Sequence, residues 1–222
     1  MTTIRPARPE DLPRVVALEQ ASYPAAEAAT ADMLAMRLSV AGDAFLVATD
    51  AAGEVIGFTC GTRAQGDRLT HESFGHHDPR GESLCVHSVV VDAGARRQGL
   101  GSALVRAVVA RARELPGVRR VLLICKEPLI ELYRACGFAL VGPSEVAVGA
   151  DPWFAMTLEL GAGPALLAHA VHGHGPVKVM VLHDWLGDRR SWDPVLPYLD
   201  PALCTYALVD LRGYGESRDL AG

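Results

Sequence analysis

The sequence predicts a mixed α/β protein, in which short strands alternate with amphipathic helices over residues 1–160. The strand signal is strongest at 83–91, an apolar run that follows a long polar stretch. The helix signal is strongest at 101–114, where apolar residues recur on one face: Leu104, Val105, Val108 and Val109. Together these signals indicate a central sheet flanked by helices.

The remaining elements follow from the same periodicities and from local capping and turn residues. Helices are expected at 9–20, with Asp11 in the first turn, at 31–38, capped by Thr30, and at 128–136. Strands are expected at 2–7, 44–49, 55–62, 119–125, 138–141 and 154–160, with a hairpin turn at 50–53. Residues 63–83 are polar, and we interpret them as one long loop, a feature that is often functional.

Composition excludes several classes of protein. Half of the 222 residues are apolar and 21% are charged, which argues against disorder. No apolar run is long enough to span a bilayer, and the N-terminus has no export signal. The net charge of −5, without a dense basic stretch, argues against a nucleic-acid partner. Five scattered cysteines without a CxxC pair indicate reduced thiols, so we expect a cytoplasmic protein with no membrane partner.

A glycine-spaced loop joins the strand at 83–91 to the helix at 101–114. Free amides at a helix N-terminus, together with the helix dipole, attract anions, and Gly99 and Gly101 allow a phosphate to approach the backbone closely. Arg96 and Arg97 add positive charge. The loop lacks the G-x-x-x-x-G-K-S/T pattern of nucleotide triphosphatases. Taken alone, it fits an anion site and an ordinary strand–turn–helix equally well.

The segment Arg96-Arg97-Gln98-Gly99-Leu100-Gly101 is similar to the (Gln/Arg)-x-x-Gly-x-(Gly/Ala) signature of the GNAT acetyltransferases. Residues 68–73, 125–129 and 137–138, with His87 and Tyr133, resemble the arylalkylamine (serotonin) N-acetyltransferase subgroup. The resemblance implies a GNAT fold over residues 1–160, with a mixed, mostly antiparallel sheet, and acetyl-CoA as co-substrate. It implies these cofactor-binding residues: Val89, Val90, Val91, Arg96, Arg97, Gln98, Gly99, Leu100, Gly101 and Ser102.

Two side chains are expected to carry the proton chemistry. Strand alternation predicts that Cys85, His87 and Val89 share one face, and a lone strand histidine is more often structural than catalytic. The resemblance reverses this balance, because it implies that His87 is the general base and Tyr133 the acid for the leaving thiolate. Cys85 stands where the animal enzymes have a first catalytic histidine, so His87 would act alone or with water. The resemblance also implies that a backbone amide at 89–91, where the strand splays from its neighbour, binds the acetyl carbonyl.

The expected substrate is a small primary amine of the arylalkylamine or polyamine type. By the same resemblance, the pocket residues are Tyr23, Pro24, Ile124, Leu129, Val148 and Phe154, although core packing explains Leu129 and Val148 equally well. The acidic balance suits a cationic substrate. We expect no metal, since adjacent histidines on a polar loop, such as His76 and His77, are usually solvated. The alternatives are a non-catalytic acyl-CoA-binding or sensory module, or an accessory domain to a hydrolase.

Residues 161–222 look like the start of an α/β-hydrolase domain. A Gly/Pro break at 161–165 precedes expected strands at 166–171, 177–182 and 205–211, a helix at 192–199, and the turn Asp210-Leu211-Arg212-Gly213-Tyr214-Gly215-Glu216-Ser217. No G-x-S-x-G nucleophile motif occurs, so no esterase activity is expected from this segment. The apolar strands at 177–182 and 206–211 are typical of a buried parallel sheet. We therefore expect this tail to be mobile, to borrow cover from the first domain, or to drive self-association.

Overall fold

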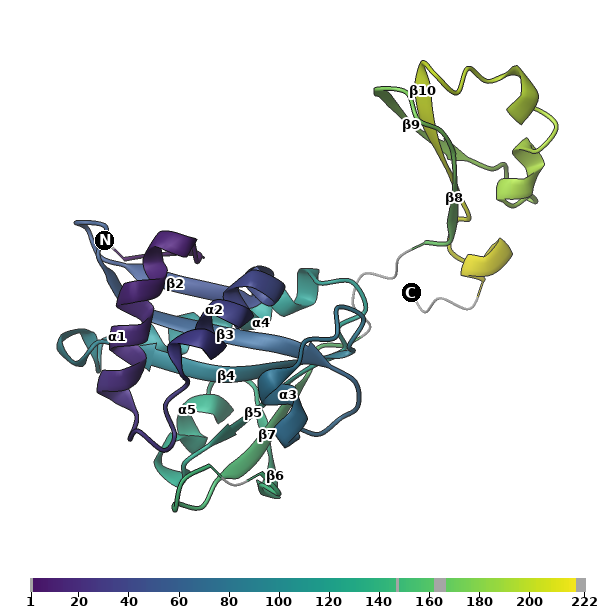
Figure 1. The fold of residues 1–222 in the computed structure, drawn as a ribbon. Coiled ribbons are helices and arrows are strands. Elements are labelled where there is room, and N and C mark those ends of the chain that lie inside the picture. The colour runs from purple at the N-terminus through teal and green to yellow at the C-terminus, as the bar shows by residue number, and fades with distance from the viewer. Residues whose placement is uncertain (1, 147, 162–166, 219–222) are drawn as a thin grey trace. The chain divides into compact units, whose positions relative to one another are not determined.

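The computed structural model describes residues 2–146, 148–161 and 167–218 (Figure 1). The chain divides into two compact units, Met1–Pro164 and Ala165–Gly222. The break expected at 161–165 lies, apart from Gly161, outside the described residues. Each unit is described separately below.

The first unit is built on a seven-stranded sheet. Its strands are β1 (Thr3–Pro6), β2 (Phe45–Thr49), β3 (Val55–Ala64), β4 (Ser83–Val91), β5 (Arg120–Cys125), β6 (Ala139–Pro143) and β7 (Phe154–Glu159). They lie in the order β1-β2-β3-β4-β5-β7-β6, and the β4–β5 pair is the parallel one among antiparallel neighbours. The mixed, mostly antiparallel sheet predicted from the sequence is confirmed, with β4 at its centre.

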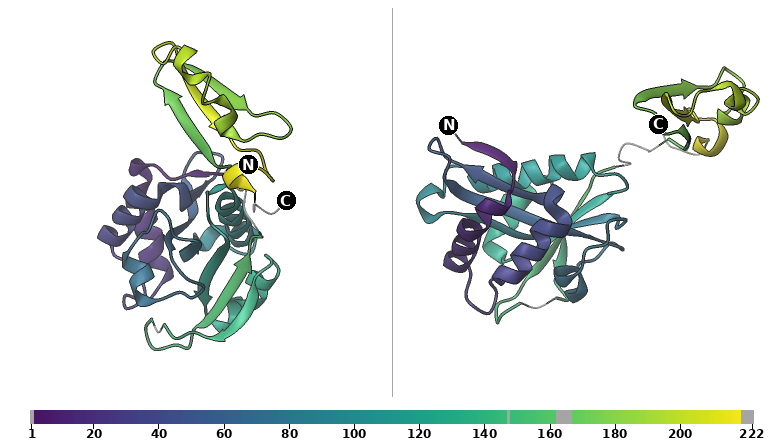
Figure 2. Two further views of the ribbon diagram at one scale, coloured as in Figure 1. Left: turned by 90° about the vertical axis from the view of Figure 1, so that its right-hand side faces the viewer. Right: turned by 45° about the horizontal axis from the view of Figure 1, so that its top comes forward.

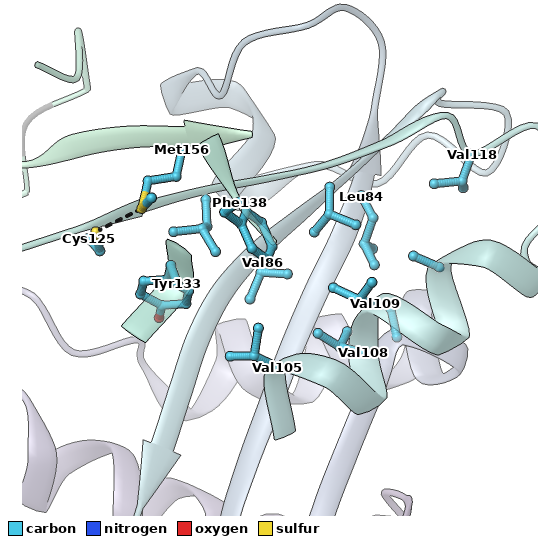
Figure 3. Close-up of a cluster of buried hydrophobic side chains, with 14 of the residues drawn as sticks. Leu84, Val86, Val105, Val108, Val109, Val118, Cys125, Tyr133, Phe138 and Met156 are labelled. Carbon is cyan, nitrogen blue, oxygen red and sulfur yellow. Dashed lines mark hydrogen bonds between the residues drawn. The ribbon is translucent and has the colours of Figure 1, made fainter. Parts of the chain in front are cut away.

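Helices cover both faces of this sheet (Figures 1 and 2). The helices are α1 (Leu12–Ser22), α2 (Ala31–Ala41), α3 (His71–Gly75), α4 (Leu100–Glu114) and α5 (Ile130–Arg134). The apolar side chains of α1 and α2 pack with Phe45, Val47 and Phe58 on one face of the sheet. Those of α4 pack with Leu46, Leu84 and Val86 on the other face, where Figure 3 shows Val105, Val108 and Val109 in the cluster. Successive side chains of β2 point to opposite faces of the sheet, so β2 contributes to two separate cores.

Two local expectations about helices are corrected. The segment 63–83 is not a continuous loop, because Thr70 and Ser73 form a reciprocal capping box that starts the short helix α3. The helix expected at 128–136 is shorter, with a 3-10 turn at Glu127–Leu129 before α5. The proline of that turn lies at its start, where the missing amide costs no helical hydrogen bond. The Thr30 cap is confirmed, since its hydroxyl accepts a hydrogen bond from the Met33 amide at 3.2 Å.

Strands β4 and β5 pair over a short stretch and then diverge. Their parallel register covers Ser83↔Arg120, Leu84↔Val121 and Cys85↔Leu122, whereas β4 stays paired with β3 as far as Val91. The backbone of β4 beyond Cys85 therefore has no register partner on its β5 side. This divergence opens the sheet in front of the loop that leads into α4.

A β-bulge interrupts β4 at His87. On β3, Cys60 pairs with Ser88 and the next residue, Gly61, pairs with Val86, so His87 has no residue opposite it. The alternation expected from the sequence is therefore wrong beyond this point. His87 faces α2 and α3, as Cys85 does, but Val89 packs with the α4-side cores. The extra residue turns His87 and Ser88 toward the same side of the sheet.

The second unit contains a three-stranded sheet of order β8-β10-β9. Its strands are β8 (His169–Gly173), β9 (Val177–Leu182) and β10 (Cys204–Val209), and β9 runs parallel to β10. In place of the helix expected at 192–199 the chain forms two 3-10 turns, Arg189–Trp192 and Leu196–Tyr198, because Pro197 cannot lie inside a regular helix.

Apolar side chains on this second unit are exposed. Met180 on β9 is 70% exposed, and Trp185 and Leu186 after it are 83% and 89% exposed. Such strands are normally covered on both faces in α/β folds.

No helix in the described ranges has both the length and the apolar character needed to cross a bilayer.

Candidate active site

A cavity lies where β4 and β5 diverge, and we call it the central cavity. Its lining includes residues on β4, β5 and α5, with Tyr23 after α1. The expected acid and base both reach it. The lining residues are Tyr23, Val86, His87, Ser88, Val89, Leu123, Ile124, Cys125, Lys126, Leu129, Tyr133 and Trp153.

The ring of His87 is held in one tautomer by Thr62 on β3. The Thr62 hydroxyl lies 2.8 Å from the Ser73 carbonyl, which can only accept, and 2.7 Å from His87 Nε2. Because the hydroxyl has a single proton and gives it to Ser73, His87 Nε2 must carry the proton of the second bond. The Nδ1 atom then holds a free lone pair, and Nδ1 is buried with no hydrogen-bond partner. A bare imidazole nitrogen beside a cavity is suited to accept a proton.

The surroundings of His87 disfavour its charged form. Burial, and secondarily the positive charge of Arg37, lower the pKa of His87 well below its usual value. The Phe74 ring stacks obliquely on the imidazole, with 4.9 Å between the ring centroids. His87 is therefore a neutral acceptor at physiological pH, and a weaker base than an exposed histidine with a pKa near 6.5.

Cys85 lies two residues before His87 on β4 and is fully buried. Burial raises the pKa of its thiol to about 11, which keeps the sulfur protonated at neutral pH. A buried thiol of this kind is a poor nucleophile, which favours direct transfer over an acetyl-enzyme intermediate. The residue at the position of the expected first histidine is thus an inert neighbour of His87.

Tyr133 on α5 also lines the central cavity. Its ring packs edge-on against Phe138 in the core cluster drawn in Figure 3, where Cys125 and Met156 lie nearby. Burial is the main cause that raises the pKa of Tyr133, so the hydroxyl keeps its proton. A thiolate released into the same cavity is desolvated too, so its proton affinity rises in parallel with that of the phenol.

Tyr23 is the second phenol of the central cavity. Burial raises its pKa, and the backbone amide of Val89, which hydrogen-bonds the Tyr23 oxygen, opposes that rise. The Val89 amide thus points away from β3 and toward the cavity side of β4. It is one of the amides that the resemblance assigns to the acetyl carbonyl.

The loop after β4 has the backbone of an anion site. Arg97 and Gly99 both adopt left-handed conformations, with φ of 59° and 81°, and Gly99 is the N-cap of the 15-residue helix α4. A Cβ atom at Gly99 would meet nothing within 4 Å, so the space beside this backbone is open. Arg96 is tied to the end of β4 by a 3.0 Å bond from Nε to the Val91 carbonyl, whereas Arg97 and Gln98 are exposed. These features fit the pyrophosphate of a coenzyme A thioester.

The expected substrate residues fall in different places. Tyr23, Ile124 and Leu129 line the central cavity. Val148 lines a neighbouring cavity, Phe154 packs against the main core, and Pro24 is exposed.

A second group of residues around the cavities was not predicted as part of the site. Lys126 lines the central cavity, donates to Glu27 at 2.9 Å and to Asp151 at 2.7 Å, and lies 5.4 Å from the Trp153 ring centroid. Thr62, Glu19 and Arg37 were equally unpredicted. Their partners lie up to 69 positions away in the chain, so no local pattern marks them. Within the described residues, no group of three or more His, Cys, Asp or Glu side chains is placed to hold a metal ion.

Comparison with known proteins agrees with this geometry. The family model described as "Acetyltransferase (GNAT) family" matches residues 12–138, which run from α1 through the glycine loop to α5. The chain belongs to the GNAT acetyltransferase family. Serotonin N-acetyltransferase of Mesocricetus auratus is 36% identical over 97 residues, 44% of this chain and 47% of that protein. The chain thus spans about half the length of the curated relatives it matches.

Solved structures share the fold of this GNAT chain. The GphF GNAT-like decarboxylase in complex with isobutyryl-CoA has 24% sequence identity and a TM-score of 0.63, covering 71% of this chain and 99% of that one. The GNAT-superfamily phosphinothricin acetyltransferase of Sinorhizobium meliloti, in complex with AcCoA, has 23% identity and a TM-score of 0.56, covering 73% and 90%. At these identities the likeness establishes the fold.

Proposed function

We propose that this GNAT protein transfers the acetyl group of acetyl-CoA to a primary amine of the arylalkylamine or polyamine type, by direct attack in a ternary complex. The observation that carries the proposal is that a free imidazole nitrogen and a protonated phenol line one cavity, and that strand β4 in its wall leads into the glycine loop. The homology to serotonin N-acetyltransferases supports an amine acceptor.

The residues of this chain would divide the work as follows. The loop 96–102 and the N-terminus of α4 hold the pyrophosphate, and the amides of β4 beyond Cys85 hold the thioester carbonyl. His87 Nδ1 accepts a proton from the attacking nitrogen, and the Tyr133 hydroxyl gives a proton to the departing thiolate. The products are an N-acetyl amine and free coenzyme A, and the proton left on His87 replaces, through solvent, the proton that Tyr133 gave to the thiolate.

A second candidate, a non-catalytic acyl-CoA-binding module, is favoured by one observation. His87 is a weakened base, and the neighbouring position holds the inert thiol of Cys85. The comparison proteins also include one whose description names a decarboxylase bound to an acyl-CoA, so a thioester in this fold does not by itself imply amine acetylation.

Thiol release from acetyl-CoA with a panel of amines separates these functions. The panel should contain 2-phenylethylamine, tryptamine and 1,4-diaminobutane, with a reaction lacking amine to measure background hydrolysis. Amine-dependent release is expected. Tight acetyl-CoA binding by calorimetry, with no amine-dependent release across the panel, would contradict the proposal and favour the binding module.

A further inference from the structure

Four buried polar atoms without hydrogen-bond partners belong to residues that line one second cavity. They are Glu19 Oε2, Glu27 Oε2, Arg37 Nε and His87 Nδ1, and the cavity, which we call the side cavity, lies among α1, α2, α3 and β4. The side cavity shares His87 and Ser88 with the central cavity. Buried polar groups in folded proteins are nearly always paired, so a convergence of unpaired ones indicates a missing ligand or water.

Glu19 has one satisfied oxygen and one free oxygen. Its Oε1 accepts the Ala29 amide at 2.9 Å and the Ser88 hydroxyl at 3.2 Å, whereas Oε2 has no partner and the residue is only 1% exposed. The two bonds to Oε1 fix the direction of the carboxylate. Burial raises the pKa of Glu19, which means that its charged form is incompletely compensated.

Arg37 does not neutralise Glu19 directly. It is 1% exposed, and its bonds run from Nη2 to the Phe74 carbonyl at 3.1 Å and from Nη1 to the Cys60 sulfur at 3.9 Å. No ion pair among the described residues joins Arg37 to Glu19. Arg37 therefore acts on Glu19 as a nearby charge. The free oxygen of Glu19 is therefore available to another cation.

We propose that the side cavity is the entry site of the substrate amine, and that Glu19 Oε2 receives the substrate ammonium and accepts its first proton. The inference rests on the amine acetyltransferase function proposed above. Primary amines are ammonium ions at neutral pH, because their pKa is near that of lysine, about 10. An ammonium ion cannot attack a thioester until it has lost one proton.

The ammonium nitrogen must lose two protons to become an amide nitrogen, and Glu19 and His87 accept one each. An N–H bond of the ammonium breaks, its proton forms a bond to Glu19 Oε2, and the nitrogen keeps the electron pair for attack at the thioester carbon. The amine nitrogen loses its second proton to His87 Nδ1 after attack. Glu19 and His87 thus act in sequence. Before the next turnover one of their two protons replaces, through solvent, the proton that Tyr133 gave to the thiolate, and the other is released.

The walls of the side cavity narrow the substrate class. Met33 and Phe74 supply apolar surface, and Glu27 adds a second carboxylate that is already paired with Lys126 at 2.9 Å. Lys126 compensates the charge of Glu27, so Glu19 is the carboxylate of this lining without an ion pair among the described residues. One such carboxylate beside apolar walls fits a monoamine with a hydrocarbon or aryl tail better than a diamine with a second cationic group. We therefore expect 2-phenylethylamine to be used with a lower KM than 1,4-diaminobutane.

The test uses Glu19→Gln in the full chain, because this change alters one property. The amide oxygen of Gln can still accept from Ala29 and Ser88, while its NH₂ group replaces the free oxygen. At pH 7, kcat/KM for 2-phenylethylamine should fall at least about a hundredfold, the range of a lost general base. The deficit should shrink as pH rises and free amine accumulates, with acetyl-CoA affinity unchanged. Glu54→Gln, at the exposed hairpin turn, is the matched control for charge and should leave all values unchanged.

The pH profile must be compared with that of the wild type, since several titratable or charged groups face Glu19. They are Arg37, Cys60, Tyr23, His71, His87 and Glu27. All of them are retained in the Gln variant, so the difference profile isolates Glu19. Glu19→Asp, which keeps the charge but retracts it, should be intermediate and serves if the Gln variant fails to fold.

The outcomes separate this inference from the proposed function. If the wild type acetylates amines and Glu19→Gln has the same rates and the same pH profile, the role of Glu19 is overturned and the proposed function stands. An equal loss at every pH, together with lowered thermal stability, would assign Glu19 a structural role and also overturn the inference. If the wild type uses no amine, the proposed function and this inference fall together.

Discussion

Replacing Thr62 with valine should separate the tautomer argument from general packing. Valine keeps the shape of threonine but removes the hydroxyl that bonds Ser73 at 2.8 Å and His87 at 2.7 Å. Thr62 is fully buried, so the Ser73 carbonyl and the His87 Nε2–H lose their partner without access to water. Each unsatisfied buried group costs about 1–3 kcal/mol, so the loss of two partners should lower the free energy of unfolding by about 2–6 kcal/mol.

Thr62→Ser is the matched control, because it keeps the hydroxyl and loses one methyl group, worth about 1 kcal/mol. Urea unfolding followed by circular dichroism measures the stability difference between the two variants. Nitrogen-15 NMR of histidine-labelled protein, with His87→Ala to assign the signal, reports which ring nitrogen carries the proton. In Thr62→Val the ring is free to carry its proton on Nδ1, so turnover should also drop at least about tenfold, as when a base loses its orienting partner.

The two valine and serine variants give a clear refutation. If Thr62→Val unfolds at the same urea concentration as Thr62→Ser and acetylates amines at the same rate, the Thr62 hydroxyl does not hold the ring. A wild-type spectrum with the proton on Nδ1 would refute the tautomer directly. Either result would remove Nδ1 as the proposed acceptor of the amine proton.

Three further outcomes are expected. Gly101→Glu should weaken acetyl-CoA binding measured by calorimetry, because it adds a negative charge beside the loop expected to bind the pyrophosphate. A Cβ atom at this position has room, with its nearest atoms at 3.9 Å, so unchanged affinity in the folded variant would place the pyrophosphate elsewhere. His87→Ala should lower turnover by about 10²–10⁴-fold and Tyr133→Phe should lower turnover with cofactor affinity kept; near-normal rates across pH in both variants would move the proton chemistry to other residues. Proteolytic cleavage between 160 and 168 should release an active acetyltransferase unit and reduce any self-association measured by sedimentation. The whole chain should hydrolyse no esters. Loss of acetyl transfer after cleavage, or ester hydrolysis by the whole chain, would show that the second unit contributes to activity.

Elements with local signals could be predicted from the sequence. The helix at 101–114 has a one-sided apolar pattern, Thr30 is a capping residue, and the turn at 50–53 ends on a glycine with φ of 88°. Helix α3 was missed because its signal is a reciprocal Thr70–Ser73 cap within a polar stretch and not an apolar face. Local rules describe single elements well for this reason.

The site was only half predictable, because its geometry depends on pairing between distant strands. The bulge at His87 arises from the register of β3 against β4, and strict alternation along one strand cannot reveal it. The opening between β4 and β5 depends on where their pairing stops. Glu19 and Thr62 look like ordinary helix and strand residues until Ser88 and His87 are placed beside them.

The bulge at His87 also bears on how this site can change over time. A residue with no partner opposite it on β3 can be replaced without disturbing the pairing of its neighbours in the sheet. The identity of the side chain at position 87 is thus uncoupled from the register that holds Val89, Val90 and Val91 at the mouth of the loop. Variation or directed evolution at this position can therefore change the proton chemistry proposed for His87 while the register of β3 with β4 beyond Ser88 is kept.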